Sequence, residues 1–296
     1  MTRKTASEHL LVRRMTSMQE VPATFSVQGA RWRDSLGTVV RILLGLFIGL
    51  AIWEIMSLVM NANGSALGFP NPVQTFERLG QYLFAGKALA GHSIYDHIFA
   101  SIRRLLVAFG LAAAMGIVLG SVLGYFDRIY QIGMVPVSIY QMIPGLAWLP
   151  VAILLFGLGD WSAIFIIFAV SSMVITIGVS SGIRMVPEVL VNAAKMTGAG
   201  RLAIFAKVLV PQASASIVNA LRLGMSSAWR VLIAAEMVVG TGVGVGCSIQ
   251  LTRDLLDYVG SFACITIICL LGLFIDRVLL AGIERWMRSR LGIGES

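Results

Sequence analysis

The sequence predicts an all-α, polytopic membrane protein with about six transmembrane helices. Of its 296 residues, 57% are hydrophobic and only 13% are charged, and the mean hydropathy is +0.84. Soluble domains average about 25% charged residues. The apolar residues form runs of the length, about 20 residues, that crosses the hydrocarbon core of a bilayer. A soluble fold could not hide so much apolar surface, whereas lipid solvates the outer faces of membrane helices.

Six apolar runs are predicted to span the membrane. Their boundaries are 39–60, 98–124, 132–157, 162–182, 215–239 and 262–281. A short amphipathic helix is predicted near 72–86, because Pro70 and Pro72 punctuate the chain just before it. Four glycines of the second span recur at spacings that permit close helix packing, and we interpret them as structural: Gly110, Gly116, Gly120 and Gly124.

The distribution of basic residues predicts the orientation. Fourteen Lys and Arg residues fall in the two tails, in segment 183–214 and at position 128, against three in the opposite loops, which are Arg78, Lys87 and Arg253. Because basic loops stay in the cytoplasm, both termini and segment 183–214 are predicted to be cytoplasmic. The organisation that follows is a cytoplasmic tail (1–37), a first span with a periplasmic segment (38–97), a core (98–282) and a cytoplasmic tail (283–296). The polar region before the first span is too long for a signal peptide, so that span is predicted to be retained.

The sequence predicts no catalytic, nucleotide or metal site. The glycine-rich segment 240–246 lacks the Lys and Ser/Thr of a P-loop, so we interpret it as a flexible periplasmic turn. No P-loop occurs elsewhere, so any ATP and Mg would be bound by another chain. No coherent Ser/His/Asp or Cys/His arrangement is present, which argues against an enzyme. The cysteines and histidines form no metal-ligand pattern: Cys247, Cys264, Cys269, His9, His92 and His97.

Among the ionisable side chains in predicted spans, Glu54, Arg230, Glu236 and Asp276 are singled out. Each costs at least about 2.5–3.5 kcal/mol in lipid, so each should face the bundle interior, water or a partner. For Glu54 and Asp276 we favour a clamp between helices. Arg230 and Glu236 are candidates for lining a solute path, and their spacing of six residues alone does not establish a compensating pair.

Pro144 and Pro150 flank Trp148 in the predicted third span. Proline removes a backbone hydrogen bond, which membrane helices tolerate where neighbours or a cavity satisfy the freed groups. Segment 143–150 is therefore predicted to form the translocation path or its gate. A kink that only shapes packing is the alternative.

The polar segment 184–211 is predicted to form a helix–turn–helix at the membrane surface. Glu188 suits the positive end of a helix dipole, and Gly198 permits a sharp chain reversal. Ala193, Ala194 and Met196 give a small, smooth surface that can seat in a groove of a partner. Five apolar side chains are predicted to pack back on the bundle: Leu202, Phe205, Val208, Leu209 and Val210. Pro211 is predicted to mark the entry of the next helix.

The spacing within this segment is its most specific feature. Asn192, Ala193 and Ala194 precede Gly198, and nine residues separate Gly198 from the Val208–Pro211 run. This pattern resembles the EAA loop, EAA-x3-G-x9-I-x-L-P, of binding-protein-dependent ABC importers. The resemblance implies a cytoplasmic coupling loop, 184–211, that docks on an ATPase subunit. It implies ATPase-coupling roles for Asn192, Ala193, Ala194, Gly198 and Pro211. Asn192 stands where that family usually has Glu, so the hydrogen-bonding group is kept and the charge is lost.

Further segments resemble the branch of these permeases that imports nitrate, sulfonates, taurine and bicarbonate. They include Pro144–Pro150, which is similar to a P-x-x-A-W-x-P segment, Phe156–Gly159 and Gly272–Asp276. The likeness covers roughly residues 40–290. Two positions depart from it: Val174 stands where the branch often has Pro, and Gly178 where it often has Asn.

The resemblance implies a type I permease subunit in the bacterial inner membrane. Its implied partners are a second copy of the permease, two ATPase subunits and a periplasmic binding protein, and its cargo is a small anionic solute. The sequence does not identify that solute, nor whether the second copy is identical or related. A stand-alone secondary transporter, which would not need the cytoplasmic loop, is one alternative. An intramembrane enzyme is another, although it would need ligands or acid–base groups clustered at one depth.

Overall fold

The computed structural model describes residues 33–64, 68–280 and 282. Within these residues the regular elements are helices, and the only β pairing there is a single bridge between Leu89 and His92. Five helical stretches of this part of the chain are long and apolar enough to cross a membrane, or six if one bent pair counts as a span. The predicted all-α polytopic fold is confirmed. The tails 1–32 and 283–296, whose cytoplasmic location the sequence predicts, lie outside the described residues.

The chain divides into two compact units, 1–55 and 56–296. The division falls within α2 (Arg33–Ala62), whose stretch Val40–Ala62 has the length and hydropathy of a membrane span. In that stretch the sequence has two charged residues, Arg41 and Glu54. The second unit contains every other described helix and all of the packing considered below.

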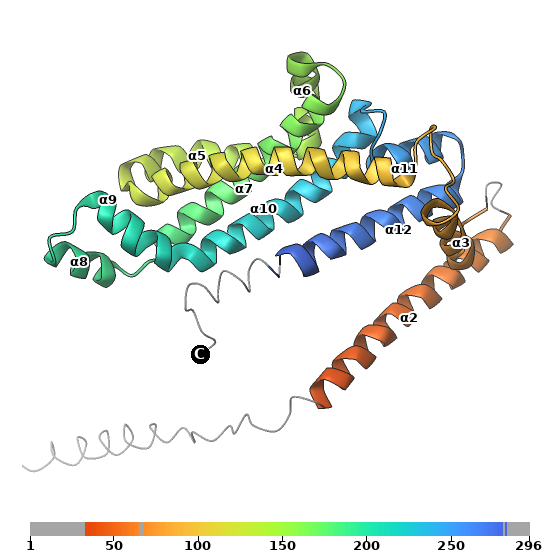
Figure 1. Cartoon of the computed structure of the whole chain (residues 1–296), viewed down its shortest axis with the longest axis horizontal. Coiled ribbons are helices and arrows are strands. Elements are labelled where there is room, and N and C mark those ends of the chain that lie inside the picture. The colour runs from red at the N-terminus through yellow and green to blue at the C-terminus, as the bar shows by residue number, and fades with distance from the viewer. Residues whose placement is uncertain (1–32, 65–67, 281, 283–296) are drawn as a thin grey trace, which may run out of the picture. The chain divides into compact units, whose positions relative to one another are not determined.

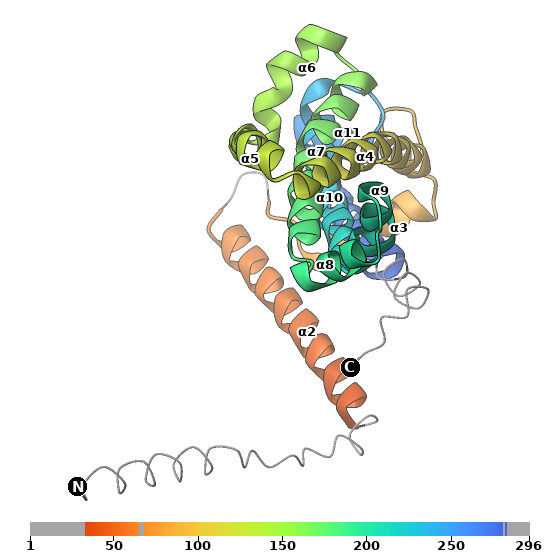
Figure 2. The same ribbon diagram turned by 90° about the vertical axis from the view of Figure 1, so that its left-hand side faces the viewer.

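Three long helices form the centre of the second unit: α4 (Ile94–Tyr125), α7 (Asp160–Arg184) and α10 (Val210–Val239). They lie side by side in Figures 1 and 2. The α4 glycines make the close approach to α7 possible, because a Cβ at Gly120 would lie 2.7 Å from the Thr176 carbonyl oxygen and from Val179 Cβ. Gly116 and Gly124 have equally close α7 neighbours, whereas Gly110 has none. The predicted glycine packing is therefore confirmed at three of the four positions.

The order of the contacts gives the helix directions. Gly116 faces Ile175 and Gly124 faces Ile183, so α4 and α7 run parallel. Gly178 faces Ala220, and Gly182 faces Ser216 closer to the start of α10, so α7 and α10 run antiparallel. A Cβ at Gly178 would lie 2.4 Å from Ala220 Cβ. Gly178 stands where the related permeases often have Asn. The close contact between α7 and α10 leaves no room for an Asn side chain at this position.

The third predicted span, 132–157, is not one continuous helix. It consists of α5 (Asp127–Met142), the 3-10 turn η1 (Gly145–Trp148) and α6 (Leu149–Phe156), and the chain bends by 97° at the break. The bend is clear where α6 turns away from α5 in Figure 1. Pro144 caps η1 and Pro150 lies in the first turn of α6, so the prolines stand where helical hydrogen bonding is interrupted. The perturbation that the prolines predict in this span is therefore confirmed, and it is a sharp bend.

Segment 184–211 forms a helical hairpin at one end of the bundle. Its helices are α8 (Glu188–Met196) and α9 (Arg201–Ile204), and α9 continues through a π-helical turn, η2 (Phe205–Leu209), into α10. Pro211 is the second residue of α10, so it marks the entry of that helix as predicted, although α9, η2 and α10 form one continuous helical stretch, Arg201–Val239. The wide turn explains this, because Val210 N–H donates to the Phe205 carbonyl five residues back and the register shifts just before the proline.

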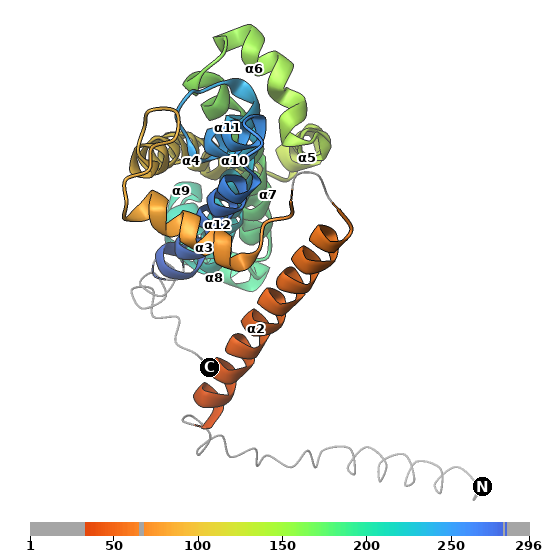
Figure 3. The same ribbon diagram turned by 90° about the vertical axis from the view of Figure 1, so that its right-hand side faces the viewer.

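The opposite end of the bundle is closed by α3 (Pro72–Leu83), α11 (Val245–Asp254) and α12 (Tyr258–Phe274), which ends in the π-helical turn η3 (Ile275–Leu280). Figure 3 shows these elements from their own side. Leu79, Tyr82, Ile94, Val245 and Cys264 belong to one buried cluster that joins α3, α4, α11 and α12.

Candidate functional site

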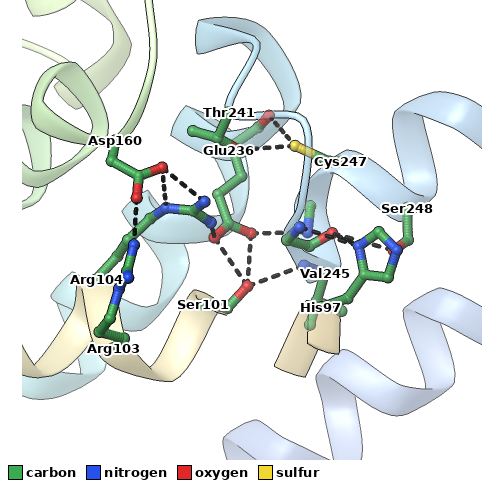
Figure 4. Close-up of polar contacts among 12 residues, drawn as sticks. His97, Ser101, Arg103, Arg104, Asp160, Glu236, Thr241, Val245, Cys247 and Ser248 are labelled. Carbon is green, nitrogen blue, oxygen red and sulfur yellow. Dashed lines mark hydrogen bonds and ion pairs between the residues drawn. The ribbon is translucent and has the colours of Figure 1, made fainter. Parts of the chain in front are cut away.

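A buried polar network joins four helices at the α3 end of the bundle (Figure 4). His97, Ser101 and Arg104 lie on one face of α4, because their spacing is that of successive helical turns. All three are buried. Glu236 of α10 lies opposite them, only 1% exposed, and it accepts hydrogen bonds from Ser101 Oγ at 2.8 Å to each of its carboxylate oxygens.

Arg104 links two carboxylates. The residue is 2% exposed, and its guanidinium contacts Glu236 Oε1 at 2.6 Å through Nη1 and Asp160 Oδ1 at 2.7 Å through Nη2. Arg103 contacts the other oxygen of Asp160 at 2.5 Å, and its side chain is exposed. Two arginines thus balance two carboxylates. This is the arrangement that a low-dielectric interior requires of buried charge.

The start of α11 completes the network. Three consecutive backbone N–H groups donate to it: Gly244 to His97 Nδ1 at 3.0 Å, Val245 to Ser101 Oγ at 2.9 Å and Gly246 to Glu236 Oε2 at 2.9 Å. A helix N-terminus has such unpaired donors and favours negative charge, so it suits a carboxylate. The interpretation of 240–246 as a flexible turn is therefore wrong at positions 244–246, because these groups are fixed by buried partners.

The other ionisable residues of the predicted spans fall in different surroundings. Asp276 pairs with Arg222 of α10 at 3.2 Å, which supports the predicted clamp between helices. Arg230 does not pair with Glu236. The basic partner of Glu236 is Arg104 instead. Arg230 is exposed and makes only a 3.4 Å contact with Ser227 of its own helix among the described residues. Glu54 lies in α2 and is half-buried.

The broken span carries the predicted path residues. Trp148 stacks on Tyr140 of α5, with ring centroids 4.4 Å apart and an angle of 24° between the rings. A small pocket beside this stack is lined by Gln141, Met173 and their neighbours. The indole N–H of Trp148 is buried without a hydrogen-bond partner in the described part of the chain. Pro144 and Pro150 are exposed on either side.

The hairpin presents an apolar surface on α8 and α9. Val189, Met196 and Leu202 are 76%, 84% and 80% exposed. Leu202 therefore does not pack back on the bundle as predicted, whereas Phe205 and Val208 do, next to the core cluster of α7 and α10. Ala193 is exposed beside Val189, but Ala194 is half-buried and faces the bundle.

The turn of the hairpin agrees with the sequence prediction. Gly198 has φ +76°, in the left-handed region, and a Cβ there would meet no atom within 4 Å. The requirement for glycine is therefore conformational and not steric. Asn192 is exposed, and its Oδ1 lies 3.5 Å from Lys195 Nζ.

Sequence reasoning missed Arg104, Ser101 and His97. The sequence did contain a signal for Arg104, because Arg103 and Arg104 fall inside the predicted second span. Placing a charge there in lipid costs as much free energy as placing Glu236 in the fifth span. The helical spacing of His97, Ser101 and Arg104 was a second signal. The hydrogen bonds from the start of α11 could not be predicted, since every residue except proline has a backbone N–H group and the sequence does not show which of them donate to side chains.

Together, the apolar bundle, the broken span and the surface hairpin define a multi-pass helical membrane protein. Residues 114–289 match the family described as binding-protein-dependent transport system inner membrane component. The chain belongs to this family. Membership implies a separate ATPase and a substrate-binding protein as partners, and it confirms the resemblance seen in the sequence.

Curated relatives cover most of the chain. A putative ABC transporter permease of Methanocaldococcus jannaschii is 34% identical over 230 residues, which are 78% of this chain and 84% of that protein. A nitrate import permease of Synechocystis is 32% identical over 214 residues (70% and 74%). A taurine transport system permease of Escherichia coli is 28% identical over 248 residues (83% and 88%). Nitrate and taurine permeases belong to the branch that the sequence motifs indicated.

A solved structure has the same fold. It is described as an inward-facing conformation of the MetNI methionine ABC transporter, with a TM-score of 0.58 and 18% identity over 65% of this chain and 94% of that one. At this identity the likeness concerns the fold alone.

Proposed function

We propose that this chain forms the translocation path of an ABC importer for a small anionic solute. A binding protein delivers the solute, separate subunits hydrolyse ATP, and a second copy of the permease completes the path. Both termini and segment 184–211 are on the cytoplasmic side in this proposal, as the distribution of basic residues predicts. The nitrate and taurine relatives support a solute with an anionic group.

The single observation that carries the anionic solute is Arg230. It lies well within a membrane span, and it is exposed without an acidic partner among the described residues. A cation at this depth is too costly to face lipid, so it faces water or a partner. An arginine that has no acidic partner in a water-filled path is suited to a passing carboxylate, sulfonate or nitrate.

Trp148 supports the same path from the broken span. Gly145, three residues earlier, lies against Val170 of α7 and Val231 of α10, so the break adjoins the helix that carries Arg230. The unpartnered indole N–H is a second donor near this route. Glu236 is not part of the proposed path, because its carboxylate is occupied by the buried network.

The hairpin is the proposed coupling surface. Its exposed residues Val189, Ala193, Met196 and Leu202 form an apolar face on a soluble loop, which an ATPase groove would cover. Asn192, Ala194, Gly198 and Pro211 shape this surface in the proposal, with Gly198 setting the turn.

Uptake by the reconstituted transporter tests the solute class. Nitrate and taurine are the first probes, with the matching binding protein and ATPase present. Arg230→Gln should lower uptake of the transported anion about tenfold or more, because a hydrogen bond to a charged group is worth about 1.5–3 kcal/mol. Arg230→Lys should retain part of it. Arg128→Gln, which changes an exposed arginine in the first turn of α5, is the matched control. Unchanged uptake in Arg230→Gln would contradict the assignment.

A further inference from the structure

Helix α3 packs against the beginning of the span that α12 forms. Its Leu79 and Tyr82 pack in one cluster with Ala263, Cys264 and Ile267 of α12. Because α12 is part of a span that begins at Tyr258, and a helix rises about 1.5 Å per residue, Ile267 lies roughly 13 Å into that span. Tyr82 lies beside Gly260 and Arg78 pairs with Asp257, so α3 lies beside the first turn of that span.

The two flanks of α3 differ in character. Its inner face, Pro72, Thr75, Leu79 and Tyr82, is buried. On one flank Val73 and Phe76 are exposed, and Phe84 extends them just after the helix. The other flank carries Gln74 and Gln81, and Glu77 lies at its edge toward Val73. At 100° per residue the exposed apolar side chains and the polar ones occupy separate arcs.

The exposed apolar flank continues onto the neighbouring span. Tyr95 of α4 donates its hydroxyl to the Leu83 carbonyl at 2.8 Å, which fixes its ring beside the end of α3. Tyr95 and Phe99 are both exposed. Val73, Phe76, Phe84, Tyr95 and Phe99 are named here the aromatic stripe. Aromatic side chains gather at the boundary between headgroups and acyl chains.

We propose that α3 is an interfacial helix whose aromatic stripe contacts lipid acyl chains at the membrane boundary. The stripe includes Tyr95 and Phe99, exposed residues in the first two turns of the α4 span, and it contains no charged residue. Helices with one apolar and one polar flank lie in the plane of the boundary in this way. The polar flank, with Gln74 and Gln81, faces water. This inference does not depend on the solute or on the ATPase.

Site-directed spin labelling of the full chain tests the proposal. The native Cys247, Cys264 and Cys269 are first replaced, and single cysteines are introduced as Val73→Cys, Phe76→Cys or Phe84→Cys. Gln74→Cys and Gln81→Cys are the matched controls on the same helix. The labelled proteins are reconstituted in vesicles of phosphatidylethanolamine and phosphatidylglycerol, and collisions with oxygen and with a water-soluble nickel chelate are measured.

On the stripe, high access to oxygen and low access to the chelate are expected, with the reverse at Gln74 and Gln81. Equal chelate access at Phe76 and Gln81 would mean that the stripe faces water. Low access to both reagents at Phe76 would mean that protein covers it, such as a second copy of the chain. Either result would overturn the proposal. Phe84 lies outside the helix, so it keeps the test informative if the substitution at Phe76 disturbs folding.

Discussion

Replacing Arg104 is the perturbation whose effect is best determined by the structure. Arg104→Met keeps the length of the side chain and removes its charge. Glu236 is then a buried carboxylate without a cation, whereas Asp160 keeps Arg103 and is 31% exposed. The cost therefore arises at Glu236. Removing one partner of a buried ion pair costs about 3–5 kcal/mol.

We expect the lower end of that range. Ser101 and the Gly246 N–H still donate to the stranded carboxylate, which offsets part of the loss. A loss of about 3 kcal/mol corresponds to roughly a hundredfold fall in the folded-to-unfolded ratio. The free energy of unfolding in mixed micelles, followed by circular dichroism, is the measurement.

A double-mutant cycle with Glu236→Leu separates the pair from general damage. The double variant should be more stable than Arg104→Met alone, because no charge is then stranded. Arg103→Met, which changes a neighbouring exposed arginine, should cost less than about 1 kcal/mol. Additive losses in the cycle, with no recovery in the double variant, would refute the reasoning.

Three further predictions follow from the geometry. Gly120→Leu should prevent the native contact of α4 with α7 and lower the yield of folded protein on size-exclusion chromatography, whereas Gly110→Leu, with open space, should not. Ala193→Asp should insert normally but lose the ATPase on co-purification, because the exposed apolar face would receive a charge; undiminished recovery of the ATPase would contradict this. Burial raises the pKa of the Cys247 thiol, so it stays protonated to a higher pH than an exposed cysteine. Its maleimide labelling should be slow at neutral pH and accelerate only above the ordinary thiol range; fast labelling at neutral pH would contradict the burial.

The sequence predicted what periodicity and composition encode. Five of the six spans appear as helices near their predicted places, and Gly198 turns the hairpin as expected. The prolines at 144 and 150 indicated a perturbation of the third span, but a 97° bend depends on tertiary contacts such as those of Gly145. Arg104 was overlooked because its apolar neighbours mask it in a hydropathy average. The π-helical turn before Pro211 has no sequence signature of its own.

The motif likewise could not predict which side of α8 faces the bundle. The sequence pattern treats Ala193 and Ala194 alike, yet one is exposed and the other faces the bundle. Adjacent residues of a helix point about 100° apart, so only the packing partner decides which is inside. Leu202 is a second example, since an apolar side chain next to a bundle can be buried either in the core or against a partner protein, and the sequence does not distinguish the two.

The central claim is that this chain conducts solute only when coupled to a separate ATPase. The most direct measurement is ATP hydrolysis and solute uptake in vesicles containing the chain, its ATPase and the loaded binding protein. The account predicts that loaded binding protein stimulates hydrolysis, that uptake requires ATP, and that Ala193→Asp abolishes both. Uptake driven by an ion gradient in vesicles that lack the ATPase would contradict it.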